Sequence, residues 1–357
     1  MINIVFASIT AFIITFLAIP AVIKIADIKG LYDVPGGRKK HKASIPRLGG
    51  IAIFAGAVFS FSFWSALLSY EPIQYLISAL IVMFFIGIKD DIIEMPASKK
   101  FIGQSIAALI VVLFADVRIT SLCGVFGIYD IPYYISAPFS FFVIILIVNS
   151  FNLVDGVDGL AGGLGAIASF TFGLWFFNYD QIPLSILAFS VFSALLAFLS
   201  YNFAPAKIFM GDTGSLVVGL ILSVLAINFV ELSFNALPYS FPFRSSPAMA
   251  IAILMIPLFD TVRIFIVRLF HKRSPFGADR NHMHHILSDM GCSHRDISII
   301  LYSVNIGFII LALGLRNISS LMLLIILMGT AIFLSFMPFI IKYFHKSGNY
   351  NIKVFKH

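Results

Sequence analysis

Residues 73–91 read IQYLISALIVMFFIGIKDD, and this stretch determines the class of fold. Its first sixteen residues carry no charged side chain, and the run ends in Lys89, Asp90 and Asp91. An apolar run that approaches about 20 residues and stops at charged groups is typical of a helix that crosses a lipid bilayer. The rest of the chain repeats this pattern.

The composition of the whole chain agrees with this stretch. Of its 357 residues, 60% are hydrophobic and only 11% are charged, whereas soluble domains have about 45–50% and about 25%. A soluble fold of this size could not bury so much apolar surface in one core. The composition therefore excludes a soluble enzyme, a disordered segment and a nucleic-acid-binding domain, and it predicts an all-α integral membrane protein.

Clusters of charged residues, prolines and glycines divide the chain into eleven apolar segments, each a candidate membrane-spanning helix. The fifth segment is short, and polar Asn149 and Asn152 lie at its end. No repeat or soluble domain interrupts the series, so we expect one catalytic domain over residues 1–357. The predicted spans are 2–25, 48–68, 73–88, 101–115, 138–151, 160–177, 183–201, 214–232, 248–268, 297–315 and 320–341.

Lysine and arginine residues predict the orientation, because basic loops stay on the cytoplasmic side. With the N-terminus outside and the C-terminus cytoplasmic, all of them fall on the inner side except Arg118, Arg244 and Arg316. All eight histidines and the acidic clusters described below fall on that side as well. We therefore expect a catalytic cleft on the cytoplasmic face.

The first acidic cluster, Asp90-Asp91, follows the third predicted span. Two adjacent carboxylates repel one another unless a cation, a metal ion or a proton relieves them. An isolated pair of this kind is often only a solvated helix end. Similar clusters on the same predicted face favour a functional interpretation.

The second cluster, NSFNLVDGVDGLAGG, occupies residues 149–163. Asn152, Asp155 and Asp158 are three residues apart, so in a helix they would line one face. The glycines remove side-chain bulk, so that backbone or a ligand can approach closely. Small residues also let membrane helices pack, but acids and amides beside lipid are costly without a function.

Two further motifs carry chemically capable groups. In FMGDTGS (209–215), Asp212 could cap a helix or bind Mg²⁺ together with substrate phosphate oxygens. In SPFGADRNHMHH (274–285), three histidines without a cysteine do not match a usual zinc site. These histidines and Arg280 could instead donate hydrogen bonds to phosphate or sugar oxygens, unless the loop is merely solvated.

The pair Asp260 and Arg263 and the basic loop 38–50 can be explained without a catalytic role. Asp260 and Arg263, three residues apart, most simply form a structural ion pair. The basic loop 38–50, which contains Lys42 and Arg47, could serve topology or attraction to anionic lipid, or it could clamp a phosphate at the membrane surface.

Taken together, five stretches resemble the polyprenyl-phosphate N-acetylhexosamine-1-phosphate transferases. They occur in the order and at the spacing of that family, although Met283 stands where some relatives have a further histidine. The resemblance implies that UDP-GlcNAc and undecaprenyl phosphate give undecaprenyl-diphospho-GlcNAc and UMP, with Mg²⁺ required and Mn²⁺ as a possible substitute. The matching stretches are 46–50, 90–91, 149–163, 209–215 and 274–285.

The resemblance also implies roles for single residues. Asp158 would recognise the uracil ring and Phe209 would stack on it, while Asp155 would border the nucleotide or the sugar. We favour a positioning role for Asp90 and Asp91, because a phosphate monoester is already mostly ionised at neutral pH and gains little from a base. Either Lys99 or Lys100 would reach a phosphate, and the sequence does not decide between them. The expected site contains the catalytic residues Asp90, Asp91, Asp155, Asp158, His282, His284 and His285, the substrate-binding residues Lys42, Arg47, Lys99, Lys100, Asn152, Phe209 and Arg280, and the metal ligands Asp212 and Asn152.

The implied setting is the cytoplasmic (inner) membrane of a bacterium, where such a reaction begins a cell-surface glycan of the O-antigen or common-antigen type. A homodimer is a possible assembly. Another UDP-N-acetylhexosamine (FucNAc, QuiNAc or MurNAc-pentapeptide) is the main alternative donor. A transporter would need mid-bilayer charges and repeats, and an aspartate-rich prenyltransferase would need paired acidic motifs, of which only Asp90-Asp91 comes close.

Overall fold

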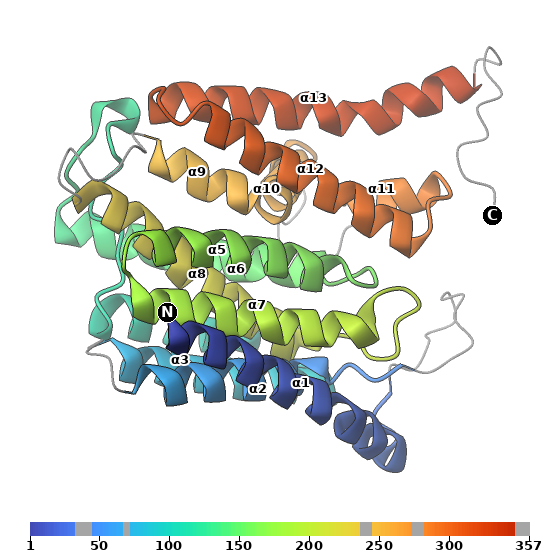
Figure 1. Ribbon diagram of the computed structural model, residues 1–357. Helices are drawn as coiled ribbons and strands as arrows, with labels where there is room; N and C mark the ends of the chain where they lie inside the picture. Colours follow the sequence, from blue (N-terminus) through green and yellow to red (C-terminus); the bar gives the residue numbers. More distant parts are fainter. Residues whose placement is uncertain (33–44, 67–71, 236–244, 273–281, 347–357) are drawn as a thin grey trace.

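The described residues of the computed structural model (1–32, 45–66, 72–235, 245–272 and 282–346) form helices that run side by side (Figure 1). Over these residues, pairing between extended segments is limited to one isolated bridge between Ser121 and Asp130. The helices are α1 (Ile2–Lys29), α2 (Gly49–Ser65), α3 (Ile73–Ile92), α4 (Ala97–Leu109) with the π-helical turn η1 (Ile110–Phe114), the 3₁₀ turn η2 (Val125–Gly127), α5 (Tyr133–Val154), α6 (Leu160–Asn178), α7 (Ile182–Asn202), α8 (Gly211–Asn235), α9 (Ser246–Ile253), α10 (Met255–Phe270), α11 (Met283–Asp289), α12 (His294–Gly314) and α13 (Ser320–Lys346).

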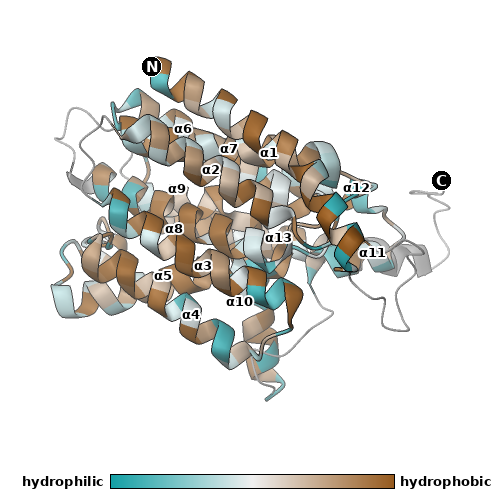
Figure 2. Cartoon of the chain, turned by 90° about the horizontal axis from the view of Figure 1, so that it is seen from below, coloured by the Kyte–Doolittle hydropathy of each residue, from teal (hydrophilic) through white to brown (hydrophobic). Residues whose placement is uncertain are grey.

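Ten of the eleven predicted apolar segments coincide with one helical stretch each, the segment 248–268 corresponds to the pair α9–α10, and the all-α membrane class is confirmed. Within the described ranges, nine helices are long and apolar enough to cross a membrane, and the bent pair α9–α10 would be a tenth. The helix α2 is shorter, with 17 residues. Figure 2 shows the apolar residues along the helices and the hydrophilic residues mostly toward their ends, as expected when a bilayer surrounds the bundle.

The predicted span over 248–268 is not a single straight helix, because the chain turns by 87° between α9 and α10. Pro257 lacks an N–H group and clashes with the carbonyl four residues earlier, so it disrupts a helix at this point. The buried side chain of Asn305 satisfies the backbone groups that this break frees. Its Nδ2 donates to the Ile253 carbonyl at 3.1 Å, and its Oδ1 accepts from the Ile256 N–H at 3.3 Å.

The acidic stretch after the fifth span also departs from the prediction. The helix α5 begins after Pro132 and is longer than predicted, but it ends at Val154. A turn follows and includes Gly159, whose φ of 79° is in the left-handed region that glycine favours. The stretch 152–158 is therefore not one helix, and Asn152, Asp155 and Asp158 do not share a helix face.

The helix α8 lies at the centre of the bundle. It packs against α2, α3, α5 and α6 and is almost completely surrounded by other helices, whereas most residues of α1 and α13 are not buried. The first residues of α8 lie near the ends of α3 and α5 and the start of α2. Figure 1 shows the corresponding connections, with α11, at the right-hand end of the bundle. The candidate site lies at this end.

Candidate active site

Carboxylates from other segments cap the first turn of α8. Asp155 accepts a hydrogen bond from the Gly211 N–H at 3.0 Å. Asp91 accepts hydrogen bonds from the N–H groups of Asp212 at 2.7 Å and Thr213 at 2.9 Å, and also from the Thr213 hydroxyl. The first N–H groups of a helix have no partner within it and carry partial positive charge. The two carboxylates therefore fix the start of α8, where Asp212 stands.

A glycine is required at the first position of α8. Gly211 has a φ of 70°, and a Cβ atom there would lie 2.1 Å from the carbonyl oxygen of Arg47. This close approach arises because residues 46–50 run along the preceding loop. The Phe209 N–H donates to the Pro46 carbonyl at 2.8 Å, and the Gly49 N–H donates to the Phe209 carbonyl at 2.9 Å. Arg47 and Phe209 are thus placed beside the start of α8 by backbone pairing.

The ammonium group of Lys100 lies at the centre of a cluster of oxygen atoms. Its Nζ is 2.6 Å from Oδ1 of Asp212 and 3.1 Å from Oδ2 of Asp90, and it donates to Oδ1 of Asn152 at 3.3 Å. The amide of Asn152 in turn donates to Asp212. Lys99 is exposed. Of the two lysines that the sequence left as alternatives, Lys100 is the one in this cluster.

These converging groups fit a hard divalent cation. Asp90, Asp212 and Asn152 offer carboxylate and amide oxygens, which are the ligand type that Mg²⁺ prefers. The described residues contain no group of three or more His, Cys, Asp or Glu side chains arranged to hold a metal by themselves. A site with few protein ligands suits Mg²⁺, which keeps several waters and binds substrate phosphates.

Asp158 lies in the turn between α5 and α6 and faces His294. Its Oδ1 is 3.0 Å from Nδ1 of His294, and its Oδ2 accepts a hydrogen bond from the Ala206 N–H at 3.1 Å. The Ser298 hydroxyl donates to the Asp158 carbonyl at 2.8 Å. These contacts join the turn after α5 to the start of α12 and to the loop that precedes α8.

The three predicted histidines lie at the start of α11 and contact two other segments. Nδ1 of His282 is 2.8 Å from Oδ2 of Asp260 on α10. The rings of His282 and His284 are parallel, with centroids 5.5 Å apart, and the His285 ring centroid is 4.3 Å from that of His284. A Cβ atom on Gly156 would lie 3.2 Å from Nε2 of His284. The absence of a side chain at Gly156 therefore lets this histidine approach the acidic turn.

Two titrating groups of this site, Asp155 and His284, lie outside the spanning helices and have strongly shifted pKa values. Burial raises the pKa of Asp155 to about 7, and the negative charges of Asp212 and Asp91 raise it further in the same direction. Burial lowers the pKa of His284 to about 4, and the neighbouring charge of His285 contributes to this shift. His284 is therefore a neutral imidazole at neutral pH.

Most of the predicted site residues thus lie together at one end of the bundle. The capping contacts of Asp91 and Asp155 link the acidic clusters to α8, and the contact of His284 with Gly156 links the histidines to them. Lys42 and Arg280 lie outside the described residues.

The sequence interpretation missed several residues that shape this region. His294 faces Asp158, and Asp260 binds a histidine in addition to the predicted ion pair with Arg263, which is confirmed at 2.8 Å. The buried amide of Asn202 accepts from the Gly159 N–H at 2.9 Å. Asn202 could have been found from the sequence, because it is an amide at the end of an apolar segment. Nothing in the neighbouring sequence marks His294 as a partner of an aspartate.

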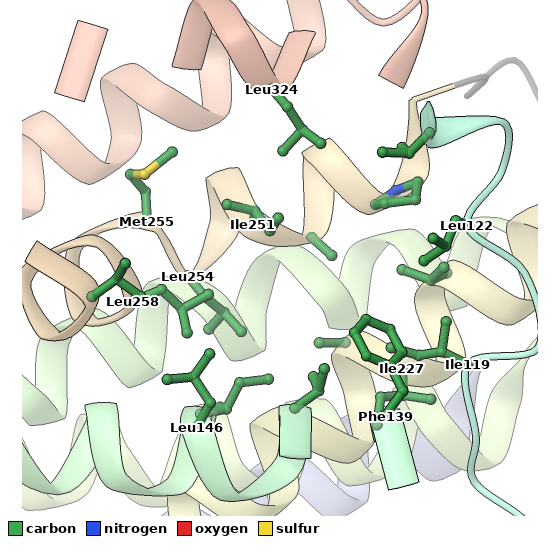
Figure 3. Close-up of a pocket in the computed structure, with 18 of the residues that line it drawn as sticks. Ile119, Leu122, Phe139, Leu146, Ile227, Ile251, Leu254, Met255, Leu258 and Leu324 are labelled. Atoms are coloured by element: carbon green, nitrogen blue, oxygen red, sulfur yellow. The ribbon is translucent and has the colours of Figure 1, made fainter. Parts of the chain in front are cut away.

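An apolar cavity of about 470 Å³ lies among α5, α8, α9, α10 and α13 (Figure 3). Phe139 and Leu146 of α5, Ile227 of α8, Leu258 of α10 and Leu324 of α13 are among the residues that line it. The break between α9 and α10 shapes one wall, because α10 leaves the direction of α9 there. The same helix α10 carries Asp260 toward the histidines.

The comparisons with known proteins agree with this arrangement. The model of the family described as "Glycosyl transferase family 4" matches residues 73–230, which include α3 to most of α8. A protein of Bacillus subtilis (strain 168) named "Probable undecaprenyl-phosphate N-acetylglucosaminyl 1-phosphate transferase" is 32% identical over 89% of this chain and 86% of its own length.

Enterobacterial relatives show the same similarity. The "Undecaprenyl-phosphate alpha-N-acetylglucosaminyl 1-phosphate transferase" of Escherichia coli (strain K12) is 29% identical over 82% of this chain and 78% of its own length. The protein of the same name from Salmonella typhi is 32% identical over 81% of this chain and 76% of its own length. The chain therefore belongs to glycosyl transferase family 4.

Proposed function

We propose that this protein transfers GlcNAc-1-phosphate from UDP-GlcNAc to undecaprenyl phosphate and releases UMP. The observation that carries the proposal is the convergence of Asp90, Asp212 and Asn152 on the Lys100 ammonium at one end of an apolar helix bundle. The names of the relatives support the choice of substrates, since each names the same sugar and the same lipid phosphate.

The reaction joins two anions, which explains the charges in the site. An oxygen of the lipid phosphate attacks the phosphorus that bears the sugar, and a new P–O–P bond forms. The bond from that phosphorus to the oxygen shared with the uridine-side phosphate breaks, and UMP leaves with this oxygen and its electron pair. Catalysis of such a step is mostly positioning and charge neutralisation.

We assign the neutralising groups from the contacts. Lys100 is a cation that lies among the acids, and Asp90 holds it in place through an ion pair. Asp212 and Asn152 would hold Mg²⁺, for which Mn²⁺ could substitute; the bound ion would neutralise phosphate oxygens of both substrates. Asp91 and Asp155 fix the start of α8 and so place Asp212. Because both oxygens of Asp91 already accept hydrogen bonds, a positioning role suits it better than that of a base.

The nucleotide and the sugar would occupy the region of the acidic turn and the histidines. We propose that Asp158 and Phe209 bind the uracil, that Asp155 borders the nucleotide or the sugar, and that His282, His284 and His285 engage the sugar and the diphosphate. The neutral ring of His284 can donate one hydrogen bond without adding charge. Arg47 and, outside the described residues, Lys42 and Arg280 would contribute basic groups around the phosphates.

The lipid substrate must keep its hydrocarbon tail in the bilayer, while UDP-GlcNAc is soluble in water. The apolar cavity beside α10 offers a surface for a hydrocarbon chain within the depth of the helices (Figure 3). We place the polar end in the cytoplasm of a bacterium, with the N-terminus outside and eleven spans, because all but three of the basic residues then lie inside. UDP-sugars are cytoplasmic, so this orientation lets the two substrates meet.

Release of UMP by the purified protein tests the proposal. The protein is given undecaprenyl phosphate with UDP-GlcNAc, with UDP-MurNAc-pentapeptide or with other UDP-N-acetylhexosamines, each with and without Mg²⁺. We expect UMP and undecaprenyl-diphospho-GlcNAc to form from UDP-GlcNAc only when both lipid and metal are present. Release of UMP without the lipid, or no release with any sugar, would contradict the proposal.

A matched pair of variants separates the site from general effects of charge. Asp212→Asn removes the proposed metal ligand at the start of α8, and we expect activity to fall at least about 100-fold. Asp289→Asn makes the same chemical change on the exposed surface of α11 and should leave activity within about twofold. Equal losses in both variants would argue against a site at Asp212.

A further inference from the structure

Asp260 is a buried carboxylate that the transfer reaction, as described above, does not use. Only 4% of its surface is exposed. Its oxygens accept hydrogen bonds from a guanidinium nitrogen of Arg263 at 2.8 Å and from the Met283 N–H at 3.1 Å, and its Oδ2 is 2.8 Å from Nδ1 of His282. A carboxylate with so little access to water requires such donors, because burial of an unpaired charge is very costly.

The contacts of Asp260 join α10 to the first residues of α11. The Met283 N–H is one of the free donors at the start of that helix, and the side chain of His282 stands directly before it. One carboxylate thus fixes both the backbone and the ring at the beginning of the histidine motif. The 87° turn between α9 and α10 gives α10 the direction in which its aspartate reaches this position.

The contact also determines which nitrogen of His282 carries a proton. An ionised carboxylate only accepts hydrogen bonds, so the His282 ring must donate through Nδ1. Its Nε2 is then left to face other partners, with the ring held at a fixed angle. The parallel ring of His284 packs on this side chain and contacts Gly156, so the placement of one ring influences the next.

We propose that Asp260 is a positioning residue for the transfer reaction, which acts by fixing the tautomer and the orientation of His282 and, through it, the placement of His284 against the acidic turn. Asp260 does not touch the substrate. The inference rests on the proposed function, because it assumes that these histidines bind the sugar diphosphate.

The substitution Asp260→Asn tests this role with little change in shape. An asparagine offers one oxygen, which can still accept from the Met283 N–H or from Arg263, but it presents an NH₂ group to Nδ1 of His282. The ring would then accept at Nδ1 and carry its proton on Nε2, which is the wrong tautomer. We expect kcat with UDP-GlcNAc to fall roughly 100-fold, while KM changes much less.

The matched control is Thr261→Val, at the next residue of α10. Thr261 is as deeply buried as Asp260, and its hydroxyl has no hydrogen-bond partner among the described residues. This variant should keep kcat within about twofold of the wild type. It separates loss of the carboxylate from general disturbance of α10.

Two further measurements distinguish positioning from mere stability. In ¹⁵N-histidine-labelled protein, with the His282 signals assigned from a His282→Gln variant, we expect a protonated Nδ1 in the wild type and a protonated Nε2 in Asp260→Asn. The double variant Asp260→Asn/His282→Gln should be no slower than His282→Gln alone, because both changes remove the same function.

Several results would overturn the inference: an unprotonated Nδ1 of His282 in the wild type, a kcat of Asp260→Asn within threefold of the wild type, or losses that multiply in the double variant. If Asp260→Asn does not fold, the tautomer of His282 in the wild type decides whether the inference holds. The labelling measurement needs no turnover, so it tests the contact between Asp260 and His282 even if the protein transfers no GlcNAc-1-phosphate. Failure of the proposed function can therefore be distinguished from failure of this inference.

Discussion

The capping of α8 by Asp91 leads to a quantitative prediction. Asp91→Ala would remove the acceptor of two backbone N–H groups and of the Thr213 hydroxyl. A buried donor left without a partner costs roughly 1–3 kcal/mol, and we take the lower limit for the estimate. Three donors at about 1 kcal/mol each give a loss of about 3 kcal/mol in the free energy of unfolding, above the roughly 0.5–2 kcal/mol of a single N-cap.

Graded variants test this estimate. Asp91→Asn keeps one acceptor oxygen, so we expect it to lose about half as much stability as Asp91→Ala. Glu94→Ala removes a carboxylate from an exposed position three residues later and should change stability by less than about 0.5 kcal/mol.

The assay is denaturant unfolding in detergent micelles, followed by the accessibility of the two cysteines, Cys123 and Cys292. UMP release is measured on the same samples. Because the start of α8 places Asp212, activity should fall in the same order as stability. Stability of Asp91→Ala within 0.5 kcal/mol of the wild type would refute the capping argument, as would equal losses in the alanine and asparagine variants.

Three other predictions follow from the same contacts. Gly211 has a φ of 70°, and the Cβ atom of an alanine there would lie 2.1 Å from a backbone oxygen, so Gly211→Ala should lower the free energy of unfolding by more than about 2 kcal/mol. Gly307→Ala, where the added Cβ atom meets open space, should be neutral or stabilising in thermal unfolding. Lys100→Ala should lower UMP release at least about 100-fold and Lys99→Ala, at an exposed position, only slightly; the reverse order would refute the assignment of Lys100. The pKa of Asp155 is about 7, against an ordinary value of 3.8, so the folded protein binds this proton more tightly and loses stability as pH rises from about 4 to 7. In metal-free buffer, Asp155→Asn should therefore be more stable than the wild type at pH 8, by at most about 4 kcal/mol in the free energy of unfolding. At pH 4 the two proteins should have the same stability, and an equal gain at both pH values would exclude this cause.

The helical segments were predictable because a bilayer imposes a local rule. Backbone groups in hydrocarbon must be satisfied within the same segment, so each long apolar run becomes a helix whatever surrounds it. The run 73–88 is accordingly contained in α3, and 160–177 in α6. The candidate residues at the ends of these runs were predictable for a related reason, since charged and amide side chains beside lipid are costly unless they serve a purpose.

The departures from the prediction involve groups that respond to distant parts of the chain. The turn at Leu254 is stabilised by Asn305, about fifty residues later, which satisfies the backbone that Pro257 disrupts. The pairing of Asp158 with His294 likewise joins two segments far apart in the chain. Spacing within a motif contains no information about such partners.

The sequence by itself determined that this protein lies in a lipid bilayer, that it is helical, and that it carries the five motifs resembling those of a lipid-linked sugar transferase. These features depend on hydropathy and on residue type. The tertiary structure decided which of two neighbouring lysines enters the acidic cluster, which carboxylates cap α8, and which aspartate orients a histidine. Those choices depend on distances of a few ångströms between helices, since hydrogen bonds and ion pairs act only at contact, and these distances are set by the packing of the whole bundle.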